Sequence, residues 1–223
     1  MGKEQDAYDK KNAEMQEQYM AFVTEKATEE DMTVMGKCGA KLKELMPNPG
    51  LKVGYTAPDF TLPDSSGTKI TLSEELKKGP VVLVFYRGAW CPVCNMHLNA
   101  LQDIVPVLKS KYNASIIALT PQMLEVSKNQ LEGTTISYKV CSDLDDSISK
   151  SYNLYYDLDP ELDDVYMKMG INVKATNGGD RLGVPVPGTF IIDKKGIVKA
   201  MQADTDYMKR MKPDEIFSGL EQN

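Results

Sequence analysis

The chain has 223 residues and a net charge of −6 at pH 7. It can therefore bury a sizeable core, and it lacks the basic excess that suits nucleic-acid binding. No apolar run approaches the ~20 residues of a membrane-spanning helix, and the charged residues 1–11 contain no apolar segment typical of a secretory signal. The four cysteines are thus expected in a reducing, cytoplasmic setting, where a close pair is more often catalytic or metal-binding than structural.

Residues 1–48 are predicted to form a helical N-terminal extension. Tyr8, Met15, Tyr19 and Phe22 share one helical face, and a second set of apolar residues shares another: Met32, Met35, Cys38, Leu42 and Leu45. Thr28 followed by Asp31 resembles a capping box that divides two helices. The segment MPNPG (46–50) ends the second helix, because prolines and glycine do not continue it. We expect this extension to pack on the core or on a partner rather than to carry chemistry.

Residues 49–223 have the pattern of an α/β domain. The predicted elements are a hairpin over 59–72, buried strands over 81–86 and 114–119, helices over 92–109 and 122–132, a strand over 137–141, a short helix over 145–152, a loop-rich region over 153–186, a hairpin over 189–201 and a final helix opened by Pro213. Alternating strands and helices followed by a hairpin and a helix predict a mixed sheet.

The segment FYRGAWCPVCNMHL (85–98) places two cysteines three positions apart. Pro92 favours the first helical position, so Cys91 should lie near the N-cap and Cys94 in the first turn. That spacing brings the Cβ atoms within about 5–6 Å, near the geometry of a disulfide. The free N–H groups and dipole of a helix N-terminus also favour the reactive thiolate. The pair is therefore predicted to be redox-active.

Two residues close in sequence, Arg87 and His97, are candidates to affect the thiols of this pair. Arg87, four residues before Cys91, either adds positive potential there or is a solvated loop arginine. His97 is the only histidine of the chain and follows Cys94 by one turn. It has the position to influence that thiol, but we expect a surface histidine.

A metal site is not expected, because a closed zinc site needs four ligands. Cys38 and Cys141 are isolated in the sequence, and His97 stands alone. Both cysteines are predicted to be small buried hydrophobic residues, one on a helical face and one at the end of a strand.

Several segments resemble the alkyl hydroperoxide reductase/thiol-specific antioxidant family, the peroxiredoxins. These are VGYTAPDFTLPDSSGTKITLSE, VVLVFYRGAWCPVC, YKVCSDLDDSISKSYNL, VPVPGTFIIDKKGIV and DTDYMKRMKPDEI. The second also resembles the WC-x-x-C motif of thioredoxins. The resemblance implies a thioredoxin-like, peroxiredoxin-type three-layer fold with a central mixed sheet.

The chain departs from the peroxiredoxin motif P-x-x-x-T-x-x-C. The peroxidatic cysteine matches Cys94, whereas the motif's threonine and proline positions hold Cys91 and Arg87. The family's second active-site arginine falls at Pro187, which instead matches the cis-proline that faces the dithiol in thioredoxins; Pro185 is the alternative for that role. These departures leave thiol redox chemistry intact but remove the usual groups that position a peroxide.

The resemblance implies a thiol-dependent antioxidant oxidoreductase. A Cys91/Cys94 dithiol would reduce hydroperoxides, without a cofactor, and a thioredoxin or glutathione-type reductant would regenerate it. Cys91 is the expected nucleophile, since Trp90 beside it matches the thioredoxin approach surface and Cys94 should be more buried. The alternatives are a protein disulfide reductase and a non-enzymatic redox-sensing or binding module, and a homodimer is possible.

Overall fold

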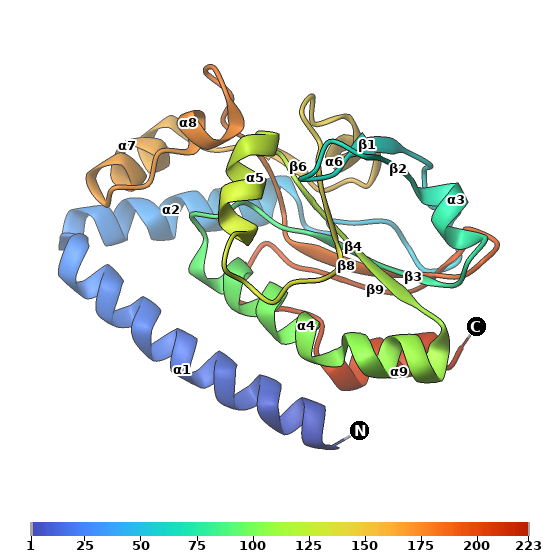
Figure 1. The fold of residues 1–223 in the computed structure, drawn as a ribbon. Coiled ribbons are helices and arrows are strands. Elements are labelled where there is room, and N and C mark those ends of the chain that lie inside the picture. Colours follow the sequence, from blue (N-terminus) through green and yellow to red (C-terminus); the bar gives the residue numbers. More distant parts are fainter. Residues whose placement is uncertain (1, 223) are drawn as a thin grey trace.

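A five-stranded mixed sheet forms the centre of the computed structural model, which describes residues 2–222 (Figure 1). The strand order is β5 (Lys139–Ser142), β4 (Ser115–Thr120), β3 (Val81–Phe85), β8 (Gly188–Ile192) and β9 (Val198–Ala203). The pairs β3–β4 and β4–β5 are parallel, whereas β3–β8 and β8–β9 are antiparallel. This arrangement confirms the predicted mixed sheet.

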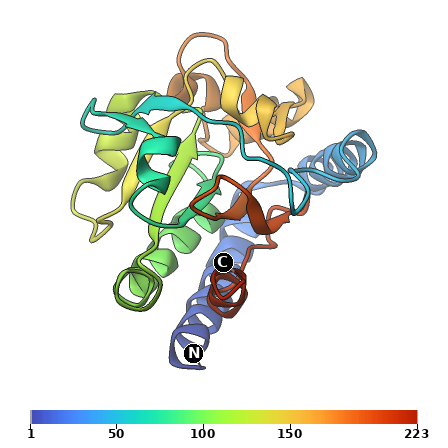
Figure 2. The same cartoon turned by 90° about the vertical axis from the view of Figure 1, so that its right-hand side faces the viewer.

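Helices cover both faces of the sheet. Val82 and Val84 of β3 pack with α4 (Pro92–Tyr112) and α9 (Pro213–Leu220), while Leu83 and Phe85 contribute to a second core on the opposite face. The hairpin of β1 (Thr61–Pro63) and β2 (Lys69–Thr71) lies over that second core together with α3 (Leu72–Leu76) and α6 (Ser147–Ser151) (Figure 2). Because both faces are covered, every residue of β3 is buried, which explains the absence of polar alternation in its sequence.

The two N-terminal helices pack against the domain. α1 (Gly2–Lys26) lies along α4 and α9 and buries Tyr8 and Met15, as the periodicity predicts. α2 (Glu29–Leu45) lies against α7 (Pro160–Lys168).

The predicted capping box opens α2. The hydroxyl of Thr28 accepts from the Asp31 N–H at 3.1 Å, and the Asp31 carboxylate accepts from the Thr28 N–H at 3.0 Å. The second predicted apolar face is only partly correct, because Cys38 is buried whereas Met32 and Leu45 are exposed.

The prediction of a loop-rich region over 153–186 is wrong. This region contains β6 (Tyr155–Asp157), α7, α8 (Val173–Asn177) and β7 (Gly183–Pro185), with β6 and β7 forming a two-stranded antiparallel sheet. Its strands have three residues each, too short for a hydrophobic period to be read. The remaining helix, α5 (Leu124–Leu131), lies where the sequence predicts it. Within residues 2–222, no helix is both long enough and apolar enough to cross a bilayer.

The capping box gives a stability prediction. Replacing Thr28 with alanine leaves the Asp31 N–H without its side-chain acceptor, and we expect the free energy of unfolding to fall by about 1 kcal/mol. Urea unfolding followed by circular dichroism measures this. The control is Thr33→Ala, which removes an exposed threonine inside the same helix; equal losses in both variants would contradict the assigned role of the cap.

Candidate active site

Cys91 and Cys94 meet at the start of α4. Cys91 is the N-cap residue, and its sulfur accepts a hydrogen bond from the Cys94 backbone N–H at 3.3 Å. The Cys94 thiol donates to the same sulfur, with the two Sγ atoms 2.6 Å apart. Pro92 occupies the first helical position and is exposed. The predicted proximity at a helix N-terminus is therefore confirmed.

The two sulfurs are enclosed, and Cys94 is not the more buried of the two, contrary to expectation. Cys91 is 0% and Cys94 1% exposed. α1 packs along α4, and the loop that precedes α9 carries Tyr207 to Tyr19 of α1, where their hydroxyls hydrogen-bond at 2.6 Å. The enclosure comes from segments remote in sequence, which helix-tip reasoning does not include.

Each sulfur faces an arginine. Arg87 Nη2 donates to Cys91 Sγ at 3.3 Å, and Arg210 Nη2 lies 3.6 Å from Cys94 Sγ. Both side chains are buried, so the interpretation of Arg87 as a solvated loop residue is wrong. Sequence reasoning missed Arg210; the basic residues before α9 in the segment DTDYMKRMKPDEI were the available signal.

The two thiols titrate as a coupled pair because they share a proton. Burial opposes the ionisation of both. The hydrogen bond between the sulfurs, together with Arg210 and Arg87, nevertheless holds the pKa of Cys94 well below the ordinary cysteine value. Burial, the hydrogen bond with Cys94 and the negative charge there hold the pKa of Cys91 well above it. Because the two sulfurs share one proton, these directions belong to the pair: its first proton leaves more readily than that of an isolated cysteine, and its second less readily.

Aromatic residues hold the Arg87 guanidinium in place. It donates to the Tyr166 hydroxyl at 3.4 Å and lies over the Tyr207 ring at 4.1 Å from the centroid. The Trp90 ring lies 5.0 Å away on another side and also packs against Tyr166. Trp90 thus helps to shape the site of Arg87. The two tyrosines carried no recognisable signal in the sequence.

His97 is buried, so the prediction of a surface histidine is wrong. Its Nε2 lies 3.3 Å from the Met211 carbonyl oxygen, and the Tyr8 ring packs edge-on against it. Burial, followed by the nearby charge of Arg210, lowers the pKa of His97 to about 3. A neutral imidazole beneath α1 therefore serves packing and gives no positive charge to Cys94.

The cis bond expected before Pro187 is absent, because the peptide bonds among the described residues are all trans. Pro187 is buried and directly precedes Gly188, which pairs with Phe85, so it lies at the sheet end from which the Arg87 loop departs. Pro185 pairs with Tyr155 in the separate β6–β7 sheet. Neither position supports the analogy with a thioredoxin cis-proline.

The remaining cysteines are buried, as predicted. Cys141 lies in β5, and burial raises the pKa of its thiol to about 12. Burial also raises the pKa of Cys38 on α2. Across residues 2–222, no three His, Cys, Asp or Glu side chains form a cluster suited to a metal ion.

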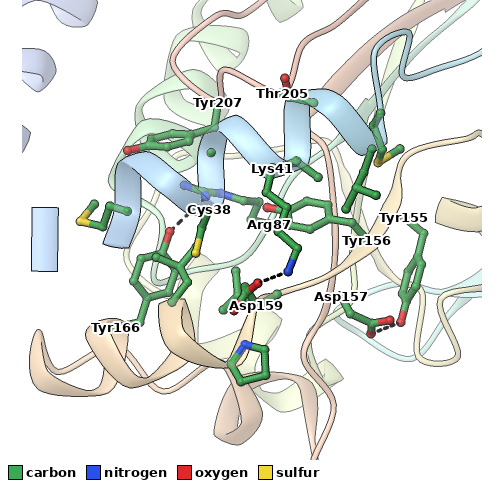
Figure 3. Close-up of a pocket in the computed structure, with 18 residues that line it drawn as sticks. Cys38, Lys41, Arg87, Tyr155, Tyr156, Asp157, Asp159, Tyr166, Thr205 and Tyr207 are labelled. Atoms are coloured by element: carbon green, nitrogen blue, oxygen red, sulfur yellow. Dashed lines mark hydrogen bonds and ion pairs between the residues drawn. The ribbon is translucent and has the colours of Figure 1, made fainter. Parts of the chain in front are cut away.

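Arg87 borders a cavity of about 580 Å³ (Figure 3). Its walls come from α2, from β6 and the start of α7, and from the loop around residues 205–207. Four tyrosines contribute to the lining: Tyr155, Tyr156, Tyr166 and Tyr207. Arg87 therefore both contacts the Cys91 sulfur and borders an aromatic cavity.

Comparison with known proteins places this site in a family. The sequence pattern of the AhpC/TSA family matches residues 53–201, more than half of the chain. The chain belongs to the AhpC/TSA family. The thiol-disulfide oxidoreductase ResA of Geobacillus kaustophilus is 27% identical over 154 residues, 69% of this chain and 70% of that protein. The alkyl hydroperoxide reductase E of Mycobacterium bovis is 24% identical over 151 residues, 67% of this chain and 83% of that protein.

Solved structures agree on the fold. The crystal structure of peroxidoxin BcpB from Mycobacterium tuberculosis matches with a TM-score of 0.59 and 23% identity, over 77% of this chain and 97% of that one. The thioredoxin-like, peroxiredoxin-type fold is thereby confirmed. The family membership supports a thiol-dependent oxidoreductase, and its relatives carry names of both peroxide and disulfide chemistry.

The arginine contacts predict how the dithiol titrates. In an Arg87→Gln variant the lower pKa of the pair should rise, because the positive charge 3.3 Å from Cys91 is lost. Thiolate absorbance at 240 nm against pH measures this. The control is Arg181→Gln, which removes a half-buried arginine bonded instead to Asp146. An unchanged titration in Arg87→Gln would show that the guanidinium does not stabilise the thiolate.

The buried imidazole predicts a pH-dependent stability. The pKa of His97 is about 3 in the folded chain and about 6.5 when unfolded. Between these two pH values the unfolded state binds one more proton than the folded state. The free energy of unfolding therefore decreases as the pH falls, by about 1.4 kcal/mol per pH unit well below pH 6.5. Urea unfolding at pH 7, 6 and 5 should show this slope in the wild type but not in His97→Gln. Parallel curves for the two proteins would refute it; the chain has no other histidine to confuse the result.

Proposed function

We propose that the protein is a thiol-dependent oxidoreductase that reduces hydroperoxides through Cys91 and Cys94. The observation that carries this proposal is the enclosed sulfur pair, which lies between two arginines, one of which borders a cavity. A small molecule that enters the cavity meets the arginine that contacts the Cys91 sulfur. A folded protein substrate would have to displace α1 or the loop that covers the sulfurs.

Cys91 is the proposed nucleophile, because three donors point at its sulfur. These are the Arg87 guanidinium, the Cys94 backbone N–H and the Cys94 thiol. Hydrogen bonds to the charged form favour that form. Arg87 also borders the cavity, so it is placed to stabilise the negative charge that develops on the peroxide oxygens.

The reaction proceeds in two steps. The Cys91 thiolate attacks one peroxide oxygen and the O–O bond breaks, which gives a sulfenic acid at Cys91 and an alkoxide that takes the proton of the Cys94 thiol. The resulting Cys94 thiolate then attacks the Cys91 sulfur, a disulfide forms and hydroxide leaves. In sum the peroxide is reduced by two electrons to an alcohol and water, and the dithiol is oxidised to a disulfide.

An external thiol of the thioredoxin or glutathione type restores the pair by disulfide exchange. The cycle requires a reducing compartment, so a cytoplasmic location is part of the proposal.

Protein disulfide reduction is the second candidate. The arrangement that favours it is a Cys-x-x-Cys pair whose first cysteine caps a helix, together with the similarity to ResA, a thiol-disulfide oxidoreductase by name. Full enclosure of both sulfurs argues against it. Parallel assays of insulin reduction and peroxide consumption separate the two candidates: peroxide turnover no faster than that of a free small thiol would reject the first.

The assignment of the nucleophile can be tested with two serine variants. In Cys94→Ser the sulfenic acid at Cys91 should accumulate, because no neighbouring thiol condenses with it, and dimedone labelling with mass spectrometry detects it. Cys91→Ser should react with peroxide at least 100-fold more slowly. If the sulfenic acid instead forms only in Cys91→Ser, then Cys94 is the nucleophile.

A further inference from the structure

The cavity beside Arg87 is completed by a helix that lies outside the family match. α2 contributes Met35, Cys38, Gly39, Leu42 and Leu45 to its lining, whereas the match spans residues 53–201. Figure 3 shows α2 on one side of the cavity and α7 on the other, with Arg87 between them. A segment that the family domain does not include therefore forms one wall of the space next to the redox pair.

The charges that border the cavity already have partners. Lys41 is 2.6 Å from Asp159, Asp157 accepts from the Tyr155 hydroxyl at 2.5 Å, and Arg87 faces the Cys91 sulfur. No further cation or anion lines the cavity among the residues that the structure describes. A charged ligand would have to break one of these interactions, so the lining suits an uncharged molecule.

Apolar and aromatic side chains form the rest of the walls. From α2 come Met35 and Leu42, which share the cavity with Leu158, Leu162 and the tyrosine rings of β6 and α7. A volume of about 580 Å³ lies within the range of small-molecule pockets, roughly 300–1,000 Å³. Hydrogen peroxide has no apolar surface to bury in such a space, whereas an aryl or branched alkyl group does.

One donor of the arginine that borders the cavity lacks a hydrogen bond. Arg87 Nε is buried without a hydrogen bond, while Nη1 and Nη2 hold Tyr166 and Cys91. A peroxide oxygen is an acceptor that can satisfy this N–H. The apolar walls and the unpartnered donor thus suit one molecule that has both a bulky apolar group and an acceptor oxygen.

We propose that α2 is a specificity element: with β6 and α7 it binds the uncharged, bulky apolar group of an organic hydroperoxide, and so makes the protein select such substrates over hydrogen peroxide. This inference rests on the proposed peroxide chemistry of Cys91 and Cys94. It adds a binding role for residues 29–45, which were expected to pack without taking part in chemistry.

The test compares cumene hydroperoxide with hydrogen peroxide. The second-order rate constant for oxidation of the reduced protein can be followed by the fluorescence of Trp90, the only tryptophan. We expect the ratio of the two constants, cumene hydroperoxide over hydrogen peroxide, to exceed 10. A ratio at or below 1 in the wild type would overturn the inference while leaving the proposed function intact, provided that both peroxides react.

Two glycines of α2 provide a matched pair of variants. A Cβ atom at Gly36 or at Gly39 would meet no atom within 4 Å, and both residues are exposed, but only Gly39 borders the cavity. We expect Gly39→Phe to lower the ratio of rate constants by about 10-fold, whereas Gly36→Phe leaves it within 2-fold of the wild type. Equal ratios in the two variants would contradict a binding role for α2.

A binding measurement separates the two proposals. The product alcohol 2-phenyl-2-propanol cannot oxidise a thiol, so its binding to the reduced protein reports on the cavity alone. It should bind the wild type and Gly36→Phe, and bind Gly39→Phe at least 5-fold more weakly. Binding without peroxide turnover would reject the proposed function, whereas turnover without binding would reject the role of the cavity.

Discussion

The burial of the sulfur pair depends on the contact between the Arg87 guanidinium and the Cys91 sulfur. A thiolate removed from water is costly unless a cation or hydrogen-bond donors meet it. Here the guanidinium lies 3.3 Å from the sulfur and the helix N-terminus donates a backbone N–H. Burial and charge thus act together: enclosure excludes bulk water, and the arginine favours an ionised sulfur inside it.

The second arginine, Arg210, adds a positive charge beside Cys94 and comes from near the C-terminal end of the chain. The groups by which peroxiredoxins usually position a peroxide are absent at the matching positions, which hold Cys91, Arg87 and Pro187. Arg87 and Arg210 nevertheless supply two positive charges, one from the loop after β3 and one from the loop before α9. An electrostatic requirement can therefore be met from new positions within the same fold.

The N-terminal helices take part in this enclosure. α1 packs on α4 and anchors Tyr207 through Tyr19, and Tyr207 in turn lies against Arg87. α2 faces α7 and forms one wall of the cavity that Arg87 borders. The extension thus contributes to the position of the guanidinium and to the cavity beside it.

The sequence by itself determined the features that depend on neighbouring residues. The apolar run of β3, the proline after Cys91 and the pair Thr28 and Asp31 act within one turn or one strand, so the central sheet, the start of α4 and the capping box were all predicted correctly. Tertiary structure alone decided the burial of His97 and the contact of Arg210 with Cys94, 116 positions away. Periodicity shows which face of an element is apolar, but it holds no information on which distant segment covers that face, and the electrostatics of this site depend on that cover.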